Sequence, residues 1–426
     1  MQPKPRARRP APHRFARPAF AALIAALSLD AAAAPLTLPD ALTRAGAFDP
    51  TYPAAEARLR AADAAVRQAA VRPNPVLGLD LENFAGGGGH QAFDRSEATI
   101  YYQETWERGG KRDARTDVAR SERDLAAAQA KARRLDLFAE VQTAWVEALA
   151  AEAEVAIAEE RIAVAERLER DVARRVAAAR DPLFVGERAR TALARARIDL
   201  DQARDAAQRA RVGLAAYWGG EPDFDLDGTA LARLDLGATE LRDDTVDMAL
   251  LSAQRDVAAA RIRLEQARGV QDPSWRAGVR RFGDGGDVAV VIGGAIPLGL
   301  RDTNRGNVER AQAERNVAEA DLLAARVLRQ REAARLLARQ SAAASEARRI
   351  ESEVLPSAER AVAQVQDGFD RGGGAFTYLE FAEAQRAVLD AKARRLGLLR
   401  SFHLDAVRLD RLSGRHAPLL SSAETR

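Results

Sequence analysis

The chain has 426 residues, 30% of them charged and 5% aromatic, with no Cys and four His. This length could hold two or three ordinary domains, but Ala, Arg, Leu and Glu dominate, a composition typical of long packed helices. Without Cys, a disulfide, a thiolate metal site and a lipid-modified Cys are excluded. No two of the four His lie at metal-ligand spacing: His13, His90, His403 and His416.

Residues 1–33 have the features of a secretory signal peptide. Six basic residues between Lys4 and Arg17 precede an apolar stretch at 19–29 and the small residues Ala31-Ala32-Ala33. Cleavage there removes six bases and one acid and changes the formal charge from +3 to about −2, which argues against nucleic acid as a partner. The alternative is a disordered basic tail before a buried helix. No later run reaches the ~18 apolar residues of a spanning helix, so we expect a periplasmic, extracellular or outer-membrane barrel protein.

In chain order, a short helix near 35–50 and a helix at about 53–71 come first. Two strand-like stretches follow, near 75–84 and 97–107, joined by a glycine loop at 86–89 that reads as a surface loop. The run 111–180 then has no Gly and no Pro, and 21 of its 70 residues are Ala. Such a run predicts one helix roughly 105 Å long, which must pack laterally against long partners. A return helix is expected at 183–217, followed by an irregular segment to about 239.

The same order of elements then occurs again. We expect a helix at 243–268, strands near 274–282 and 287–297, a second long helix from about 307 to Asp370 and a return helix at 376–412. Corresponding breaks in the two halves are offset by 191 to 198 residues. This spacing indicates an internal duplication. The expected organisation is a signal peptide (1–33), a first repeat (34–217), an equatorial linker (218–239), a second repeat (240–415) and a tail (416–426).

The strand-like stretches alternate apolar and polar residues, as in Leu77, Leu79 and Leu81 against Asp80 and Glu82. Each is long enough to cross a bilayer as a tilted strand. Four strands cannot close a barrel, and an open sheet edge is not tolerated in lipid, so membrane strands would have to be pooled by several subunits. Three copies would give 12 strands, an even number within the bacterial range. The alternative is a pair of ordinary hairpins that cap a soluble helical bundle.

Several motifs carry a family resemblance over about residues 36–415. They are Pro73-Asn74-Pro75, Gly109-Gly110-Lys111-Arg112, Arg301-Asp302-Thr303-Asn304-Arg305-Gly306 and Tyr378-Leu379-Glu380-Phe381-Ala382-Glu383. In this order and spacing the chain resembles the TolC-like outer-membrane efflux family, and most of all its cobalt–zinc–cadmium branch. The resemblance implies a mainly α fold with a small β part. Long helical hairpins would form a trimeric α-barrel, and four strands per subunit would contribute to a shared 12-stranded transmembrane β-barrel.

The resemblance also implies the partners and the location. It implies a homotrimer in the lipids of the outer membrane that extends into the periplasm. A periplasmic adaptor (membrane fusion protein) and an inner-membrane RND-type transporter would complete a tripartite pump. Two features depart from the family pattern: the first helical turn reads Ala179-Arg180-Asp181-Pro182-Leu183, without the usual Gly, and the second turn has extra Gly at 373 and 374.

Glu380 and Glu383 follow the second turn at i and i+3 and share one helix face. They match an acidic pair that rings the periplasmic entrance in the family, where crowding in a trimer should raise some carboxylate pKa values. The alternative is a pair of solvated carboxylates with Arg386 as a partner. Asp367 and Asp370 are further gate candidates, with capping and solvation as the alternative. The candidate adaptor-docking tips are Asp181, Pro182, Leu183, Phe184, Gly372, Gly373, Gly374 and Phe376.

The sequence contains no recognisable catalytic constellation, phosphate loop or cofactor motif, so we do not expect an enzyme. Arginine pairs such as Arg174-Arg175 and Arg394-Arg395 are expected to be solvated or to bridge helices. The favoured function is a passive exit duct of an efflux pump. A periplasmic coiled-coil adaptor and an envelope scaffold are the alternatives. Heavy-metal cations as cargo rest on the resemblance alone.

Overall fold

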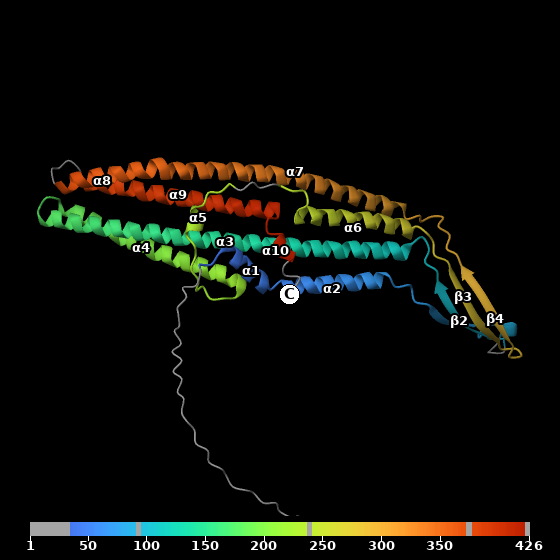
Figure 1. The fold of residues 1–426 in the computed structure, drawn as a ribbon. Helices are drawn as coiled ribbons and strands as arrows, with labels where there is room; N and C mark the ends of the chain where they lie inside the picture. The colour runs from blue at the N-terminus through green and yellow to red at the C-terminus, as the bar shows by residue number, and fades with distance from the viewer. Residues whose placement is uncertain (1–34, 91–94, 237–240, 372–376, 422–426) are drawn as a thin grey trace, which may run out of the picture.

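The computed structural model describes residues 35–90, 95–236, 241–371 and 377–421. Long helices run side by side along the molecule, with the sheet at one end and the ends of the helical hairpins at the other (Figure 1). Helices α1 (Leu38–Phe48), α5 (Thr229–Ala232) and α10 (Pro418–Ser421) lie near the middle (Figure 1). Within these ranges no helix is long and apolar enough to cross a membrane.

Helix α3 (Lys111–Ala177) is the longest element, with 67 residues. It spans roughly 100 Å at 1.5 Å per residue, as the run without Gly and Pro predicted. Its partners are α4 (Leu183–Ala215) over the hairpin end, α9 (Tyr378–Ser413) in the middle, and α2 (Tyr52–Ala69) and α6 (Val246–Arg268) over the sheet end. Because α3 contacts all four of these helices, it is the central helix of the fold.

The second long helix differs from the expectation of one continuous α-helix. It consists of α7 (Arg305–Arg349), a π-helical segment η3 (Ile350–Val354) and α8 (Leu355–Arg371). Pro356 explains the interruption, because proline has no N–H and its ring clashes with the carbonyl four residues earlier. Widening the helix to an i→i+5 bond, from the Leu355 N–H to the Ile350 carbonyl, relieves that clash.

Apolar packing is divided into patches along the length rather than gathered in one centre. The largest patch lies near the middle of the long helices, here called the equator, where α1, α3 and α9 meet. Phe138, Val141 and Leu149 on α3 are almost fully buried there. Smaller patches hold the hairpin end, around Val172 and Phe381, and the sheet end, around Ala260. Each patch fixes the lateral position of α3 against a different partner.

Ion pairs between neighbouring helices fill the intervals between these patches. Arg211 pairs with Glu152 at 2.6 Å between α4 and α3, and Lys392 with Glu160 at 2.6 Å between α9 and α3. Arg394 and Arg395 reach Glu346 and Glu351 at 2.8 Å, so this arginine pair bridges helices as expected. Exposed pairs of this kind contribute little stability one by one, but their repetition fixes the axial register of the helices.

The sheet contains β1 (Val76–Glu82), β2 (Glu97–Thr105), β3 (Ser274–Phe282) and β4 (Val288–Ala295), all antiparallel in the order β1-β2-β3-β4. A short 3-10 turn, η1 (Gly88–His90), lies between β1 and β2, and another, η2 (Ala216–Trp218), follows α4. The order helix, two strands, long helix and return helix occurs twice along the chain. The expected irregular linker contains α5, and the expected tail contains α10, two short helices that the sequence reasoning missed.

Candidate functional site

One face of the sheet is apolar across all four strands. The register places Leu79, Ile100, Val279 and Val290 in one row and Leu77, Tyr102, Ala277 and Ile292 in the next. Most of these side chains are exposed; Leu77 is 77% exposed and Ile292 80%. Tyr102 and Trp275 pack on this face with 5.7 Å between ring centroids, at the end of the sheet that is nearer to the helices. A broad apolar sheet face bordered by aromatic rings is the surface that a membrane strand presents to lipid.

The opposite face is polar and carries charge networks. Arg280 donates to Thr99 Oγ1 at 2.9 Å and pairs with Glu82 at 3.0 Å and with Glu97. Arg276 lies 3.6 Å from Asp80 and stacks over Tyr101 at 5.3 Å from the ring centroid. The alternation Arg276, Gly278, Arg280 is visible in the sequence, but the acids that these arginines meet lie on β1 and β2, at least 183 residues earlier in the chain.

Two glycines shape the polar face. A Cβ on Gly78 would lie 2.3 Å from Cζ of Tyr101, and one on Gly278 would lie 2.5 Å from the carbonyl oxygen of Ile100. Tyr101 therefore lies flat over strand β1 only because Gly78 has no side chain. On this face Thr99 is buried and Tyr101 and Arg280 are half-buried, whereas most side chains of the apolar face are exposed. The polar face is thus the more enclosed side of the sheet.

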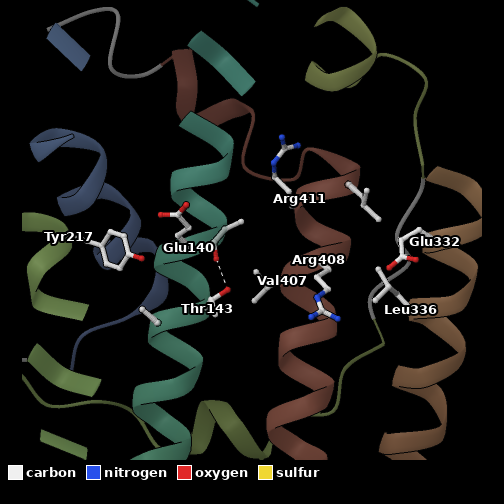
Figure 2. Close-up of a pocket in the computed structure, with 11 residues that line it drawn as sticks. Glu140, Thr143, Tyr217, Glu332, Leu336, Val407, Arg408 and Arg411 are labelled. Atoms are coloured by element: carbon white, nitrogen blue, oxygen red, sulfur yellow. Dashed lines mark hydrogen bonds between the residues drawn. The ribbon is translucent and has the colours of Figure 1, made fainter. Parts of the chain in front are cut away.

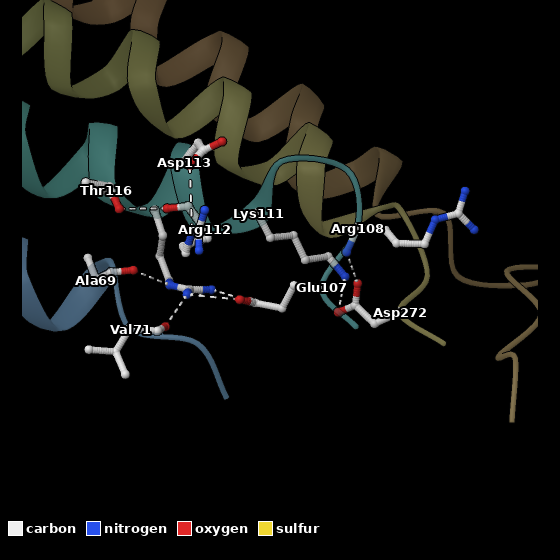
Figure 3. Close-up of polar contacts among 10 residues, drawn as sticks. Ala69, Val71, Glu107, Arg108, Lys111, Arg112, Asp113, Thr116 and Asp272 are labelled. Atoms are coloured by element: carbon white, nitrogen blue, oxygen red, sulfur yellow. Dashed lines mark hydrogen bonds and ion pairs between the residues drawn. The ribbon is translucent and has the colours of Figure 1, made fainter. Parts of the chain in front are cut away.

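A polar cluster joins the sheet to the helices (Figure 3). The Asp272 carboxylate accepts from Lys111 Nζ at 2.6 Å and from the Arg108 backbone N–H at 2.9 Å. Burial raises the pKa of Asp272, but the Arg108 N–H and the Lys111 ammonium outweigh it, and the pKa lies below its ordinary value. This contact ties the start of α3 to the end of the α6–β3 connection. It gives the Lys111 side chain of the Gly-Gly-Lys-Arg motif a structural role.

Arg115 adds the third segment to this junction (Figure 3). Its guanidinium donates to Glu107 at 2.6 Å and to the carbonyl oxygens of Ala69 and Val71 at 3.1 Å. In the second half, Asn304 lies at the corresponding position, just before α7. Its backbone is in the left-handed region at φ 56°, and its side-chain amide donates to the Glu265 carbonyl at 2.7 Å. Both junction motifs therefore hold the end of one helix against the start of the next.

A shallow groove of about 530 Å³ opens at the equator between α3, α9 and α7 (Figure 2). Leu336 and Val407 give it an apolar floor, and Glu140, Glu332 and Arg408 lie at its rim. Thr143 donates to the Ala139 carbonyl at 2.8 Å, so its hydroxyl is satisfied within α3. The groove offers an apolar contact surface rather than a reactive centre.

The first hairpin turn closes in a Schellman motif. The Arg180 N–H donates to the Arg175 carbonyl at 2.8 Å and the Ala179 N–H to the Val176 carbonyl at 3.0 Å. Ala179 occupies the left-handed position at φ 54°, where glycine is favoured. Asp181 is paired with Arg175 at 2.7 Å and is largely buried, so its carboxylate braces the turn. Leu183 and Phe184 beside it are 80% and 61% exposed.

The acidic pair after the second turn has two different environments. Glu380 caps its own helix: its carboxylate accepts from the Thr377 N–H at 2.7 Å and the Thr377 hydroxyl at 2.9 Å. In the single chain these bonds lower the pKa of Glu380. The raised pKa expected from the sequence depends on carboxylates of neighbouring copies in a trimer, so it stays a prediction. Glu383 is exposed, and within the described residues it forms no ion pair with Arg386.

The remaining predicted tip residues are placed only in part. Asp367 is exposed near the end of α8, and Asp370 lies in its last turn. Gly372, Gly373, Gly374 and Phe376 fall outside the described residues. The docking and gate roles of all these residues stay predictions.

A second groove, of about 750 Å³, lies between the hairpin ends of α3, α4 and α9. Glu383 lines it together with Arg188, Tyr378 and Arg386. Arg188 lies 5.9 Å from the ring centroid of Tyr378. In the described part of the chain, no group of three or more His, Asp or Glu residues is arranged to hold a metal ion.

Comparisons with known proteins agree with this geometry. The family model "Outer membrane efflux protein" matches residues 42–220 and 282–415. The cobalt-zinc-cadmium resistance protein CzcC of Cupriavidus metallidurans is 31% identical over 390 residues, 90% of this chain and 91% of that protein. The nickel-cobalt-cadmium resistance protein NccC of Alcaligenes xylosoxydans xylosoxydans is 30% identical over 70% of this chain and 69% of its own.

The fold matches solved structures as well. The outer membrane protein VceC of Vibrio cholerae aligns with a TM-score of 0.70 over 88% of this chain and 96% of its own, at 23% identity. Long hairpins that end in a sheet thus share the fold of TolC-like outer-membrane channels. The chain belongs to the outer membrane efflux protein family, and its place is the outer membrane.

Proposed function

We propose that the chain is one third of a passive exit duct in a tripartite efflux pump. Three copies would form a 12-stranded barrel in the outer membrane and an α-helical tunnel across the periplasm. The two repeats, 34–217 and 240–415, would each supply two strands and one hairpin to this wall. The observation that carries the proposal is the apolar sheet face, which continues without a break across four strands at one end of hairpins roughly 100 Å long.

The open edges of the single chain support a closed ring of copies. Strands β1 and β4 each have one partner within the described sheet, and an open edge is not tolerated in lipid. Helices α4 and α7 lie at the two outer sides of the helical layer. Both expose aliphatic side chains, among them Ile198 on α4 and Val317 and Leu328 on α7. A head-to-tail contact that joins one side to the other closes into a ring when the rotation between neighbouring copies is an exact fraction of a full turn.

The relatives suggest the cargo. CzcC and NccC are described as resistance proteins for cobalt, zinc and cadmium and for nickel, cobalt and cadmium. We therefore propose divalent heavy-metal cations as substrates, delivered by an RND-type transporter of the inner membrane. Rings of carboxylates near the entrance favour cations. Asp367, Asp370 and Glu383 are the candidates for such rings, with Glu380 as a helix cap that adds charge.

The exposed apolar side chains at the first turn are proposed to dock the adaptor. Leu183 and Phe184 begin α4 and project from the end of the molecule, where a helical hairpin of an adaptor could pack against them. Asp181 and Pro182 would set the turn that presents them, and Gly372, Gly373, Gly374 and Phe376 would form the second half of the docking surface.

A resistance assay tests both parts of the proposal. In a strain without the chain, the wild-type gene should restore growth on zinc, cobalt or cadmium. The double variant Leu183→Asp/Phe184→Asp should fail to restore growth, although the protein still reaches the outer membrane as a trimer. Ala54→Asp, which adds a charge at an exposed position in the first turn of α2, is the control and should restore growth. Full resistance with the double variant would remove the docking role of this turn.

A further inference from the structure

Strand β3 carries two consecutive arginines that lie on opposite faces of the sheet. In the strand register Arg280 lies opposite Thr99 of β2 and Ala289 of β4, on the polar face. Arg281 lies opposite Ala98 of β2 and Val288 of β4, on the apolar face. One strand thus offers two equal charges, of which only one would face the interior of the proposed duct.

The charges of the polar face do not cancel. Three carboxylates, Asp80, Glu82 and Glu97, share this face with two guanidinium groups, Arg276 and Arg280. Arg276 is associated with Asp80 at 3.6 Å. Arg280 alone contacts both remaining acids, Glu82 and Glu97, and donates to the Thr99 hydroxyl between them. Loss of the Arg280 charge would therefore leave two carboxylates without a positive partner.

We propose that Arg280 is a specificity-determining residue that limits the cation selectivity of the barrel interior. This inference rests on the proposed function, in which the polar face lines a water-filled duct. With three copies, Arg280 places three positive charges in one ring at the height of Glu82 and Glu97. Low-dielectric walls concentrate the field of such a ring, so one charge per subunit changes the local concentration of ions.

Reversal potentials of the purified full-length channel in planar lipid bilayers, measured under a KCl gradient, test the proposal. Arg280→Gln should raise the ratio of K⁺ to Cl⁻ permeability by about twofold or more, and more strongly at low salt, where screening is weaker. Arg280→Lys keeps the charge but loses the planar fork, and it should leave the ratio near the wild-type value. Arg281→Gln removes the same charge from the other face and is the matched control with an unchanged ratio.

A second variant keeps the test valid if Arg280→Gln fails to assemble. Glu82 is half exposed, and Glu82→Gln removes one of the carboxylates next to Arg280. It should lower the permeability ratio, opposite in sign to Arg280→Gln. An unchanged ratio in Arg280→Gln, or equal shifts in Arg280→Gln and Arg281→Gln, would overturn the role of Arg280 and leave the duct in place. A wild-type protein that forms no conducting pores would overturn the proposed function itself.

Discussion

The two long hairpins have the same place in the two halves of the chain, yet they are stabilised differently. In the first, α3 runs 67 residues without interruption and ends in a Schellman turn with Ala179 in the left-handed position. In the second, a π segment separates α7 from α8, and the return helix α9 starts at a Thr377–Glu380 capping box. The first hairpin is a regular rod with a strained turn, and the second is an interrupted rod with a capped return helix.

This difference shows that the two halves keep the same architecture with different local irregularities. Pro356 is accommodated because five residues before it adopt the wider π geometry. Helix α3 has no such segment. The four predictions below use this contrast, in order of decreasing effect.

A proline in α3 should have the largest effect. Ala163→Pro, at an exposed position of α3, removes a helical hydrogen bond where no π segment absorbs the clash, and it should destabilise the hairpin by about 3 kcal/mol or more. Ala163→Gly is the control and should cost only about 1 kcal/mol. Thermal unfolding in detergent, followed by circular dichroism, measures both. Equal losses for the two variants would contradict the view that α3 depends on an unbroken hydrogen-bond ladder.

The first turn should become more stable with glycine. Ala179→Gly relieves the left-handed strain at φ 54° and should stabilise the turn by about 1 kcal/mol. Ala178→Gly, one residue earlier at φ −84° where alanine carries no strain, should instead destabilise it by about 0.5–1 kcal/mol. Hydrogen exchange of the Arg180 amide, which donates in the Schellman motif, reports on this turn. The same sign for both variants would remove strain at Ala179 as the explanation.

The second return helix should depend on its cap. Thr377→Ala removes the hydroxyl that accepts from the Glu380 N–H and should weaken the first turn of α9 by about 1 kcal/mol. Thr377→Ser keeps the hydroxyl and serves as the control. Faster amide exchange confined to the first turn of α9 is the expected result, and exchange that is unchanged in Thr377→Ala would show that the cap is not needed.

The same cap should make the second turn sensitive to acid. The pKa of Glu380 is lowered by hydrogen bonds from Thr377, first from its backbone N–H and then from its hydroxyl. A carboxylate with a depressed pKa stabilises the folded state fully above its unfolded value of 4.5, and this contribution is lost as the pH falls through the folded pKa. Exchange at the start of α9 should therefore accelerate below about pH 4.5, and Glu380→Gln should abolish this pH dependence.

Much of the fold follows from local sequence patterns. The run at 111–180 without Gly and Pro fixed the extent of α3 to within three residues, because nothing in it stops a helix. Period-two alternation located all four strands. The π segment was missed because the expected helix was extended through Pro356. The α10 helix was missed because its contacts with the equatorial core come from distant parts of the chain.

The functional surfaces were less predictable than the fold. Alternation indicated that each strand has an apolar and a polar side, but only the register shows that Arg280 meets Glu82 and Glu97. The contact of Asp272 with Lys111 needs a pairing 161 residues apart. Asp181 was predicted at a docking surface, while its side chain is turned inward to Arg175. Long-range partners of this kind leave no local signature in one sequence.

In the proposed duct, one chain supplies only a third of a closed wall. Native mass spectrometry of the purified mature protein in detergent tests it most directly. We expect an assembly of three copies that remains together in detergent and loses solubility when the detergent is removed. A protein that is monomeric, soluble in water and stable without detergent would contradict it.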